Sequence, residues 1–216
     1  MTDKIIDKMN MINKIYEDNY QKYTVKDKST LSNILVDIDE LRIKLMMKTS
    51  FNDLDMVEVR KSNIHGNGVF AKVDININEI ITFYPVNILQ LYVGNDESIL
   101  RFSKKYKEIH GIDFINEFYK INKCYKYNCD NRNSIIGDPD IIDNNNYLGH
   151  MINDSMSHNK TKKSKKIYKK LSQSQSNCEF HNLGPFQLFV PVISNKNIKK
   201  DDEIFASYGI QYWDNI

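Results

Sequence analysis

The chain has 216 residues, which suits one main domain with an appendage and is enough to bury a sizeable core. Its 30 Lys and Arg residues nearly balance 28 Asp and Glu residues, so a formal net charge of +2 excludes nucleic-acid binding through overall charge. Three cysteines indicate a reducing compartment without a disulfide framework. The N-terminus lacks the apolar core of a signal peptide, and no apolar run approaches the ~18 residues of a membrane span. We therefore expect a soluble intracellular protein, nuclear or cytoplasmic, with no membrane partner.

Residues 1–55 are predicted to form an N-terminal helical region. Apolar side chains recur at helical spacing on either side of a polar break at 24–29, and Thr30 is a candidate cap of the second helix. The positions at this spacing are Ile5, Ile6, Met9, Ile12, Ile15, Tyr16 and Tyr20, then Leu31, Ile34, Leu35, Ile38, Leu41 and Leu45. Two hypotheses follow: a helical hairpin packed on the main domain, or an arm for substrate docking or for homodimer formation.

Alternating apolar and polar residues at 57–61 and 69–74 predict a β-hairpin around Gly66-Asn67-Gly68. Glycines at this turn permit a left-handed backbone and allow a ligand to approach the main chain closely, although a simple tight turn is the favoured interpretation of a lone Gly-x-Gly. Residues 79–84 predict the next strand, which Pro85 ends.

Residues 95–130 interrupt this β-pattern and predict a helical insert. Ile99, Leu100, Phe102, Tyr106 and Ile109 suit one helix, which ends at His110-Gly111, and Asp113 is a candidate cap of another. The three cysteines at 124, 129 and 178 form no paired short-spaced motif, so no metal site is predicted.

An insertion at 157–176 is rich in lysine and serine, with a run of lysines from Lys162 to Lys170. Its composition favours a basic, flexible, solvated loop. Two other hypotheses are a weak contact with DNA phosphates or an acidic substrate through these lysines, and a nuclear-import address. After this insertion, residues 186–193 and 203–206 predict the last two strands.

Three separate stretches together carry a family resemblance. They read HGNGVFA at 65–71, LGHMINDS at 148–155 with NCEF at 177–180, and DDEIFASYGIQYWDNI at 201–216. This order of a Gly-x-Gly turn, two Asn segments and a Glu-led strand ending in Tyr resembles the SET domain over about residues 56–213. The resemblance implies a mainly β (α+β) fold of small sheets around a pseudoknot-like crossing, with the N-terminal helices and the helical insert added.

The same resemblance implies an S-adenosylmethionine-dependent protein-lysine methyltransferase that acts on a histone or another protein. It makes Tyr208 the catalytic residue, also in contact with the cofactor, and makes Asn177 a structural residue at the crossing. The other implied cofactor contacts are His65, Gly66, Asn67, Gly68, Asn153 and Asp154. Asp154 stands where the family usually has His; because the family contact there is mainly from the backbone to adenine, Asp can keep it.

Methyl transfer to lysine requires a neutral amine, although a free lysine has a pKa near ~10.4. Burial in an apolar channel and the like charge of a sulfonium both lower that pKa. The channel residues implied by the resemblance are Tyr84, Phe180, Ala206, Tyr212 and Trp213. Since neither Phe180 nor Ala206 is a tyrosine that would crowd the lysine, di- or trimethylation is a further hypothesis.

Two alternatives to the enzyme remain. A SET fold without catalysis would be a binding module, and the unusual Asp154 together with the insertion at 157–176 motivates this alternative. A nucleic-acid-binding β-protein is the other, and the lysine run motivates it.

Overall fold

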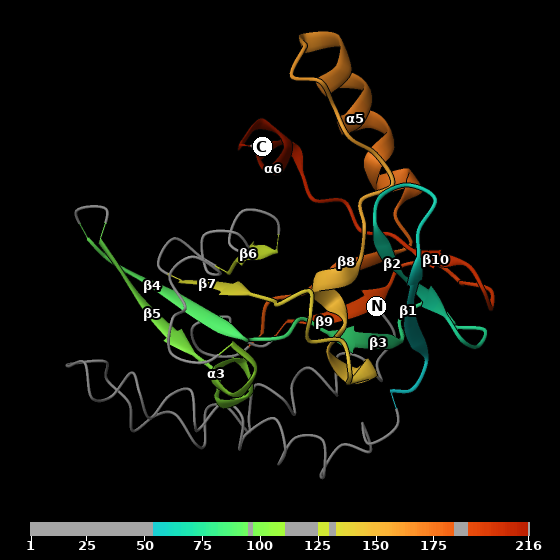
Figure 1. Cartoon of the computed structure of the whole chain (residues 1–216). Helices are drawn as coiled ribbons and strands as arrows, with labels where there is room; N and C mark the ends of the chain where they lie inside the picture. Colours follow the sequence, from blue (N-terminus) through green and yellow to red (C-terminus); the bar gives the residue numbers. More distant parts are fainter. Residues whose placement is uncertain (1–53, 95–96, 111–124, 130–132, 184–189, 216) are drawn as a thin grey trace. The chain divides into compact units, whose positions relative to one another are not determined.

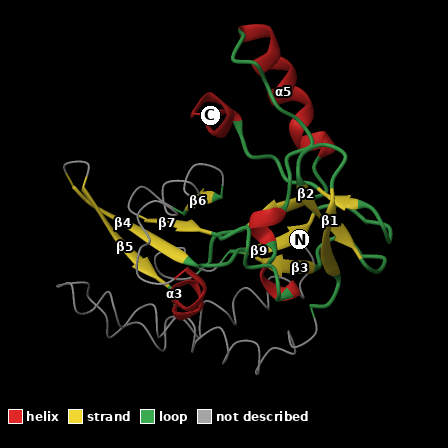
Figure 2. Ribbon diagram, in the orientation of Figure 1, coloured by secondary structure: helices red, strands yellow, loops and turns green. Residues whose placement is uncertain are grey.

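The computed structural model describes residues 54–94, 97–110, 125–129, 133–183 and 190–215. The predicted N-terminal helices, the helix expected from Asp113 and Cys124 lie outside these residues. The described elements are small antiparallel sheets and short helices (Figures 1 and 2), which confirms the predicted mainly β fold. They belong to two compact units; the first contains residues 85–141 and 182–190, and the second contains 54–84, 142–181 and 191–216.

In the second unit, the predicted hairpin is present. It consists of β1 (Val57–Lys61) and β2 (Asn67–Ala71), and β10 (Glu203–Ile204) pairs with the other edge of β2. The connecting loop is 62–66, because Lys61 already pairs with Asn67 and Gly66 takes the left-handed φ of 51°. The turn therefore lies earlier than the predicted Gly66-Asn67-Gly68, whose last two residues belong to the strand.

The other sheet of the second unit has the strand order β3-β9-β8. Its strands are β3 (Ile80–Phe83), β9 (Pro191–Ser194) and β8 (Cys178–Phe180). Every residue of β3 and β9 is buried, as expected for short apolar runs in a core. The strand predicted at 79–84 is thus confirmed, and the described C-terminal part of the strand predicted at 186–193 belongs to β9.

The first unit contains a four-stranded sheet where a helical insert was predicted. Its order is β5-β4-β7-β6, and the strands are β5 (Glu97–Phe102), β4 (Ile88–Gly94), β7 (Asn133–Ile136) and β6 (Lys126–Asn128). Ile99, Leu100 and Phe102 lie in β5 rather than in a helix, so this part of the prediction was wrong. A short apolar run fits the periodicity of a helix as well as that of a strand, and the antiparallel pairing of β5 with β4 makes this run a strand.

Helix α3 (Lys104–His110) follows β5 and contains Tyr106 and Ile109, which were predicted to be helical. Tyr106 is fully buried and packs in one cluster with Ile88 and Ile136 of the sheet. The helical part of the predicted insert therefore starts after the sheet strand instead of replacing it.

The other helical elements among the described residues belong to the second unit: η2 (Asn145–Tyr147), η3 (Gly149–Met151), α5 (Lys162–Gln175) and α6 (Ile210–Asn215). Helix α5 lies in the insertion that was predicted to be flexible, so that prediction was wrong. Thr161 caps this helix by accepting a hydrogen bond from the backbone of Ser164 at 3.2 Å, and Tyr168 and Ser172 are buried. None of the helices in the described part of the chain has the length and apolar character needed to cross a membrane.

Candidate functional site

Asn153 joins three segments that are far apart in the sequence. Its side-chain nitrogen donates to the backbone oxygens of His65 at 3.1 Å and Asn67 at 3.0 Å, and lies 3.0 Å from Oε1 of Glu203. Its backbone oxygen accepts from the backbone nitrogen of Ala206 at 3.0 Å. The Gly-x-Gly hairpin, the first Asn segment and the terminal strand therefore meet at one side chain, which is only 8% exposed.

The oxygens around Asn153 form a cluster of acceptors. An amide NH₂ has two hydrogens, yet three oxygens lie within 3.1 Å of this nitrogen. One of these oxygens belongs to the carboxylate of Glu203, which also accepts from Ser62 Oγ at 3.0 Å. Each of these oxygens has a further lone pair, so the cluster can also accept from an ammonium group beside Asn153. Sequence reasoning assigned no site role to Glu203 or Ser62, because an acid that opens a strand is usually solvated.

Gly68 is needed where Glu203 approaches the hairpin. A Cβ at position 68 would lie 2.1 Å from Glu203 Oε1 and 2.9 Å from Asn153 Nδ2. Gly66 differs, because a Cβ there would meet no atom within 4 Å and its φ of 51° is the reason for glycine. The two glycines of the motif thus have different roles: Gly66 takes the left-handed backbone conformation of the exposed turn, and Gly68 leaves space for the carboxylate of Glu203.

Asn177 lies at the crossing of segments that the family resemblance implied. Its side chain donates to the backbone oxygen of Glu203 at 2.9 Å and accepts from the backbone nitrogen of Phe205 at 2.8 Å. The backbone nitrogens of Asn177 and Cys178 both donate to the oxygen of Phe205, at 2.9 and 3.1 Å. Because Phe205 also pairs with Asn153, the terminal strand runs between the two Asn segments.

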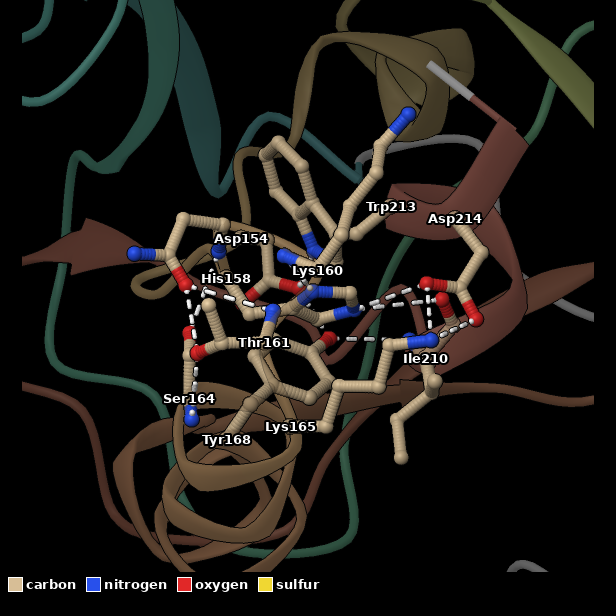
Figure 3. A network of polar contacts seen from close by, with 12 residues as sticks. Asp154, His158, Lys160, Thr161, Ser164, Lys165, Tyr168, Ile210, Trp213 and Asp214 are labelled. Carbon is tan, nitrogen blue, oxygen red and sulfur yellow. Dashed lines mark hydrogen bonds and ion pairs between the residues drawn. The ribbon is translucent and has the colours of Figure 1, made fainter.

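Asp154 is a buried carboxylate on which four donors converge. Its Oδ2 accepts from the hydroxyl of Tyr168, from the backbone nitrogen of Tyr208 at 2.9 Å and from Nε1 of Trp213 at 3.1 Å. Its Oδ1 accepts from the backbone nitrogen of Met156 at 3.0 Å. Figure 3 shows Asp154 with Tyr168 and Trp213 around it. The side chain that replaces the usual His therefore connects the first Asn segment, α5 and the C-terminal segment.

Tyr168 is a site residue that sequence reasoning missed, because it lies in the insertion predicted to be flexible. Burial and the hydrogen bond to Asp154 raise the pKa of its hydroxyl, which therefore stays protonated and donates to the carboxylate. The hydroxyl oxygen also accepts from the backbone nitrogen of Gly209 at 2.9 Å. A lone aromatic residue within a lysine- and serine-rich stretch was the available signal.

The predicted catalytic Tyr208 belongs to an aromatic group at the end of the chain. Its hydroxyl donates to the backbone oxygen of Ile152. Its ring contacts Tyr212 edge-on, with centroids 4.6 Å apart, and stacks on Trp213 at 6.1 Å with an 18° interplanar angle. Three of the predicted site residues are thus together.

A second aromatic group contains two more of the predicted channel residues. Tyr84 meets Phe180 edge-on at 5.9 Å and His150 at 6.3 Å. Gly149 lies directly against this segment, since a Cβ there would be 2.9 Å from the backbone nitrogen of Tyr84. The remaining channel residue, Ala206, is buried beside the oxygen of Asn153.

Helices α5 and α6 are held together by an ionic contact that is also drawn in Figure 3. Lys165 Nζ donates to Asp214 Oδ2 at 2.7 Å, which lowers the pKa of the Asp214 carboxyl, and lies 2.6 Å from Asp214 Oδ1. His158 Nε2 is 3.8 Å from the same oxygen and 3.4 Å from the backbone oxygen of Ile210. Across the described residues, no group of three or more His, Cys, Asp or Glu side chains is arranged to hold a metal ion.

Comparison with known proteins adds a family assignment to this geometry. A search of curated protein sequences finds no significant match. Among solved structures, a proposed histone methyltransferase from Plasmodium falciparum is 21% identical, covers 73% of this chain and 96% of its own, and has a TM-score of 0.36, too weak a likeness to support an argument. The model of the SET domain matches residues 66–209, about two thirds of the chain and a span that contains Gly66-Asn67-Gly68, both Asn segments and Tyr208. The chain therefore belongs to the SET-domain family, as its motifs predicted.

Proposed function

We propose that the protein is an S-adenosylmethionine-dependent protein-lysine N-methyltransferase that acts on a histone or another protein. Membership of the SET-domain family supports the proposal. The strongest support is that two consecutive residues contact both the candidate catalytic tyrosine and the candidate cofactor-binding hairpin. The backbone oxygen of Ile152 accepts a hydrogen bond from the hydroxyl of Tyr208, and the side chain of Asn153 donates to the backbone of the Gly-x-Gly hairpin. The candidate catalytic group and the candidate cofactor contacts are thereby held by the same short segment.

The acceptor cluster fits the amino end of the cofactor. The backbone oxygens of His65 and Asn67 and the carboxylate of Glu203 accept from the side-chain nitrogen of Asn153, and the remaining lone pairs of these three residues would hold an ammonium group beside it. When bound, the cofactor supplies an activated methyl group on a positively charged sulfur. Gly66 leaves open space beside its backbone for such a ligand.

The chain's own residues would prepare the lysine. The rings of Tyr208, Tyr212 and Trp213 contact one another and would form the apolar wall of the lysine channel, and enclosure there would lower the pKa of the lysine amine and leave it neutral and nucleophilic. Ile152 fixes the hydroxyl of Tyr208, and Asp154 fixes its backbone. Precise alignment of the amine can contribute about 7–11 kcal/mol to lowering a barrier.

The test is incubation with methyl-labelled S-adenosylmethionine, a histone panel and a whole-cell extract. We expect label on a protein band with the natural chain, none with Tyr208→Phe, and unchanged labelling with Tyr92→Phe, which alters an exposed tyrosine of the first unit. Cofactor binding by calorimetry without any label would instead identify a non-catalytic binding module. Absence of both would contradict the proposal.

A further inference from the structure

Helix α5 carries most of its lysines on one exposed face. Six lysines lie between Lys162 and Lys170, and the helix contains no acidic residue. Five of the six are exposed: Lys162, Lys163, Lys166, Lys169 and Lys170. At 3.6 residues per turn these five positions fall within an arc of about 120°. We call this set the lysine face.

The opposite side of α5 is attached to the candidate site. Tyr168 is buried and donates to Asp154, and the buried Ser172 accepts from Ser207 Oγ at 3.1 Å. Lys165, at the edge of the lysine face, is paired with Asp214. The helix is thereby fixed in orientation, and in Figure 1 it projects from the sheets of its own unit.

The lysine face has no counter-charge from its own unit. Within the described part of the chain, no ion pair joins any of its five lysines to an acid, whereas Lys165 at its edge and Lys72 and Lys199 in other elements are each paired. Five positive charges repel one another on so small a surface, and binding a polyanion reduces this electrostatic repulsion.

We propose that the lysine face binds the phosphate backbone of nucleic acid. Eight residues of rise separate Lys162 from Lys170, about 12 Å. Duplex DNA places about seven phosphate charges along that length, and its major groove, about 12 Å wide, admits an α-helix. Lysine ammonium groups act as point charges toward phosphate, and the face contains no arginine that would read base edges in a bidentate way. The contact is therefore independent of sequence.

A nucleic-acid duplex suits this face better than an acidic peptide does. The duplex is a preformed rod with closely spaced charges, whereas an acidic peptide must lose conformational entropy to present as many charges together. The inference does not depend on methyl transfer. Nucleic acid on the lysine face would lie on the side of α5 away from Tyr168, so it would leave the Asp154 contacts in place.

The test uses the full chain and a fluorescently labelled 20-base-pair duplex of mixed sequence, with binding followed by anisotropy. If each of the five lysines neutralises one phosphate, affinity falls about 500-fold between 50 and 200 mM salt. Lys166→Gln/Lys169→Gln should weaken binding and reduce that fall to about 40-fold. Glutamine has nearly the same helix propensity as lysine, so α5 is retained, which circular dichroism checks.

The matched control is Lys199→Gln/Lys200→Gln, which removes the same charge from the exposed turn before β10. We expect this variant to keep the affinity and salt dependence of the natural chain. Equal losses in the two double variants would show a net-charge effect and overturn the proposal, as would no loss in either. Competition by a glutamate polymer at the same charge concentration, as strong as that by unlabelled duplex, would overturn it in favour of an acidic protein partner.

Discussion

At the residue scale, Asp154 explains how this chain differs from its family pattern. A carboxylate only accepts hydrogen bonds, and it has lone pairs for several donors at once. Tyr168, Tyr208, Trp213 and Met156 all donate to it. A neutral imidazole has one acceptor nitrogen and would leave most of these groups without a partner. Asp at this position therefore suits the four donors, one of which is Tyr168 of α5.

Asp154→Asn should destabilise the protein, because an amide NH₂ directed at N–H and O–H donors cannot accept from them. We expect the free energy of unfolding to fall by about 1.5–3 kcal/mol, the range for hydrogen bonds to charged groups. Trp213 is the only tryptophan, so its emission reports directly on the lost contact and should shift to the red. Urea unfolding followed by fluorescence measures both effects.

The exposed Asp140 provides the control for this prediction. Asp140→Asn makes the same chemical change on the surface and should alter stability by less than about 0.5 kcal/mol. If Asp154→Asn behaved like this control and left the emission of Trp213 unchanged, the four-donor arrangement would be wrong.

Gly68→Ala should reduce stability, because the new methyl group displaces the carboxylate of Glu203 from Asn153 and Ser62. Overpacking of this kind costs about 1–3 kcal/mol. In a Glu203→Ala background the closest clash is removed and only the 2.9 Å approach to Asn153 Nδ2 remains, so Gly68→Ala should cost clearly less there. A double-mutant cycle of unfolding free energies measures the difference. Strictly additive effects would show that the approach of Glu203 is not the reason for glycine at position 68.

At the element scale, tertiary contacts produce a structure other than the one that the local sequence pattern predicted in two segments. Composition favoured a flexible loop at 157–176, but a Thr161 cap and the anchoring of Tyr168 produce α5. Ile99, Leu100 and Phe102 suited a helix, but pairing with β4 makes them a strand. The presence of the hairpin and of β3 was predicted correctly, since each is specified by residues close in sequence, although the hairpin turn lies at 62–66 rather than at Gly66-Asn67-Gly68. The partners of α5, Asp154 and Ser207, are distant contacts that no local pattern shows, whereas β5 pairs with the strand next to it and was missed because its short apolar run suits a helix as well as a strand.

Tyr168→Phe tests the anchor of α5 through its pH dependence. The folded pKa of Tyr168 lies above the ordinary value of 10.0, because burial and then the bond to Asp154 favour the protonated form. Its stabilisation is therefore complete below pH 10 and is lost as pH rises through the folded pKa. The free energy of unfolding of the natural chain should exceed that of Tyr168→Phe by about 1.5–3 kcal/mol at pH 8, and this difference should narrow above pH 10. A gap that stays constant up to pH 11 would show that the ring, not the hydroxyl, anchors the helix.

At the scale of the whole molecule, the motifs predicted the family because their order along the chain survives large insertions. They did not predict which side chains bind one another. Glu203 meets Asn153 across 50 positions, and Asn153 meets His65 across 88. The residues proposed to hold cofactor and substrate all belong to the second unit. Ligand binding should therefore appear as added resistance of that unit to unfolding.

S-adenosylmethionine should raise the melting temperature of the protein, since a ligand bound only by the folded state adds about 2.7 kcal/mol of stability at 100 times its dissociation constant. Tyr208→Phe should keep this shift while losing turnover, because the acceptor cluster around Asn153 is unchanged. Asn153→Ala should lose most of the shift, since it removes the side chain that ties the hairpin to Glu203. Differential scanning fluorimetry over a ligand titration measures all three. A shift that Asn153→Ala retains in full would mean that the ligand binds away from the acceptor cluster.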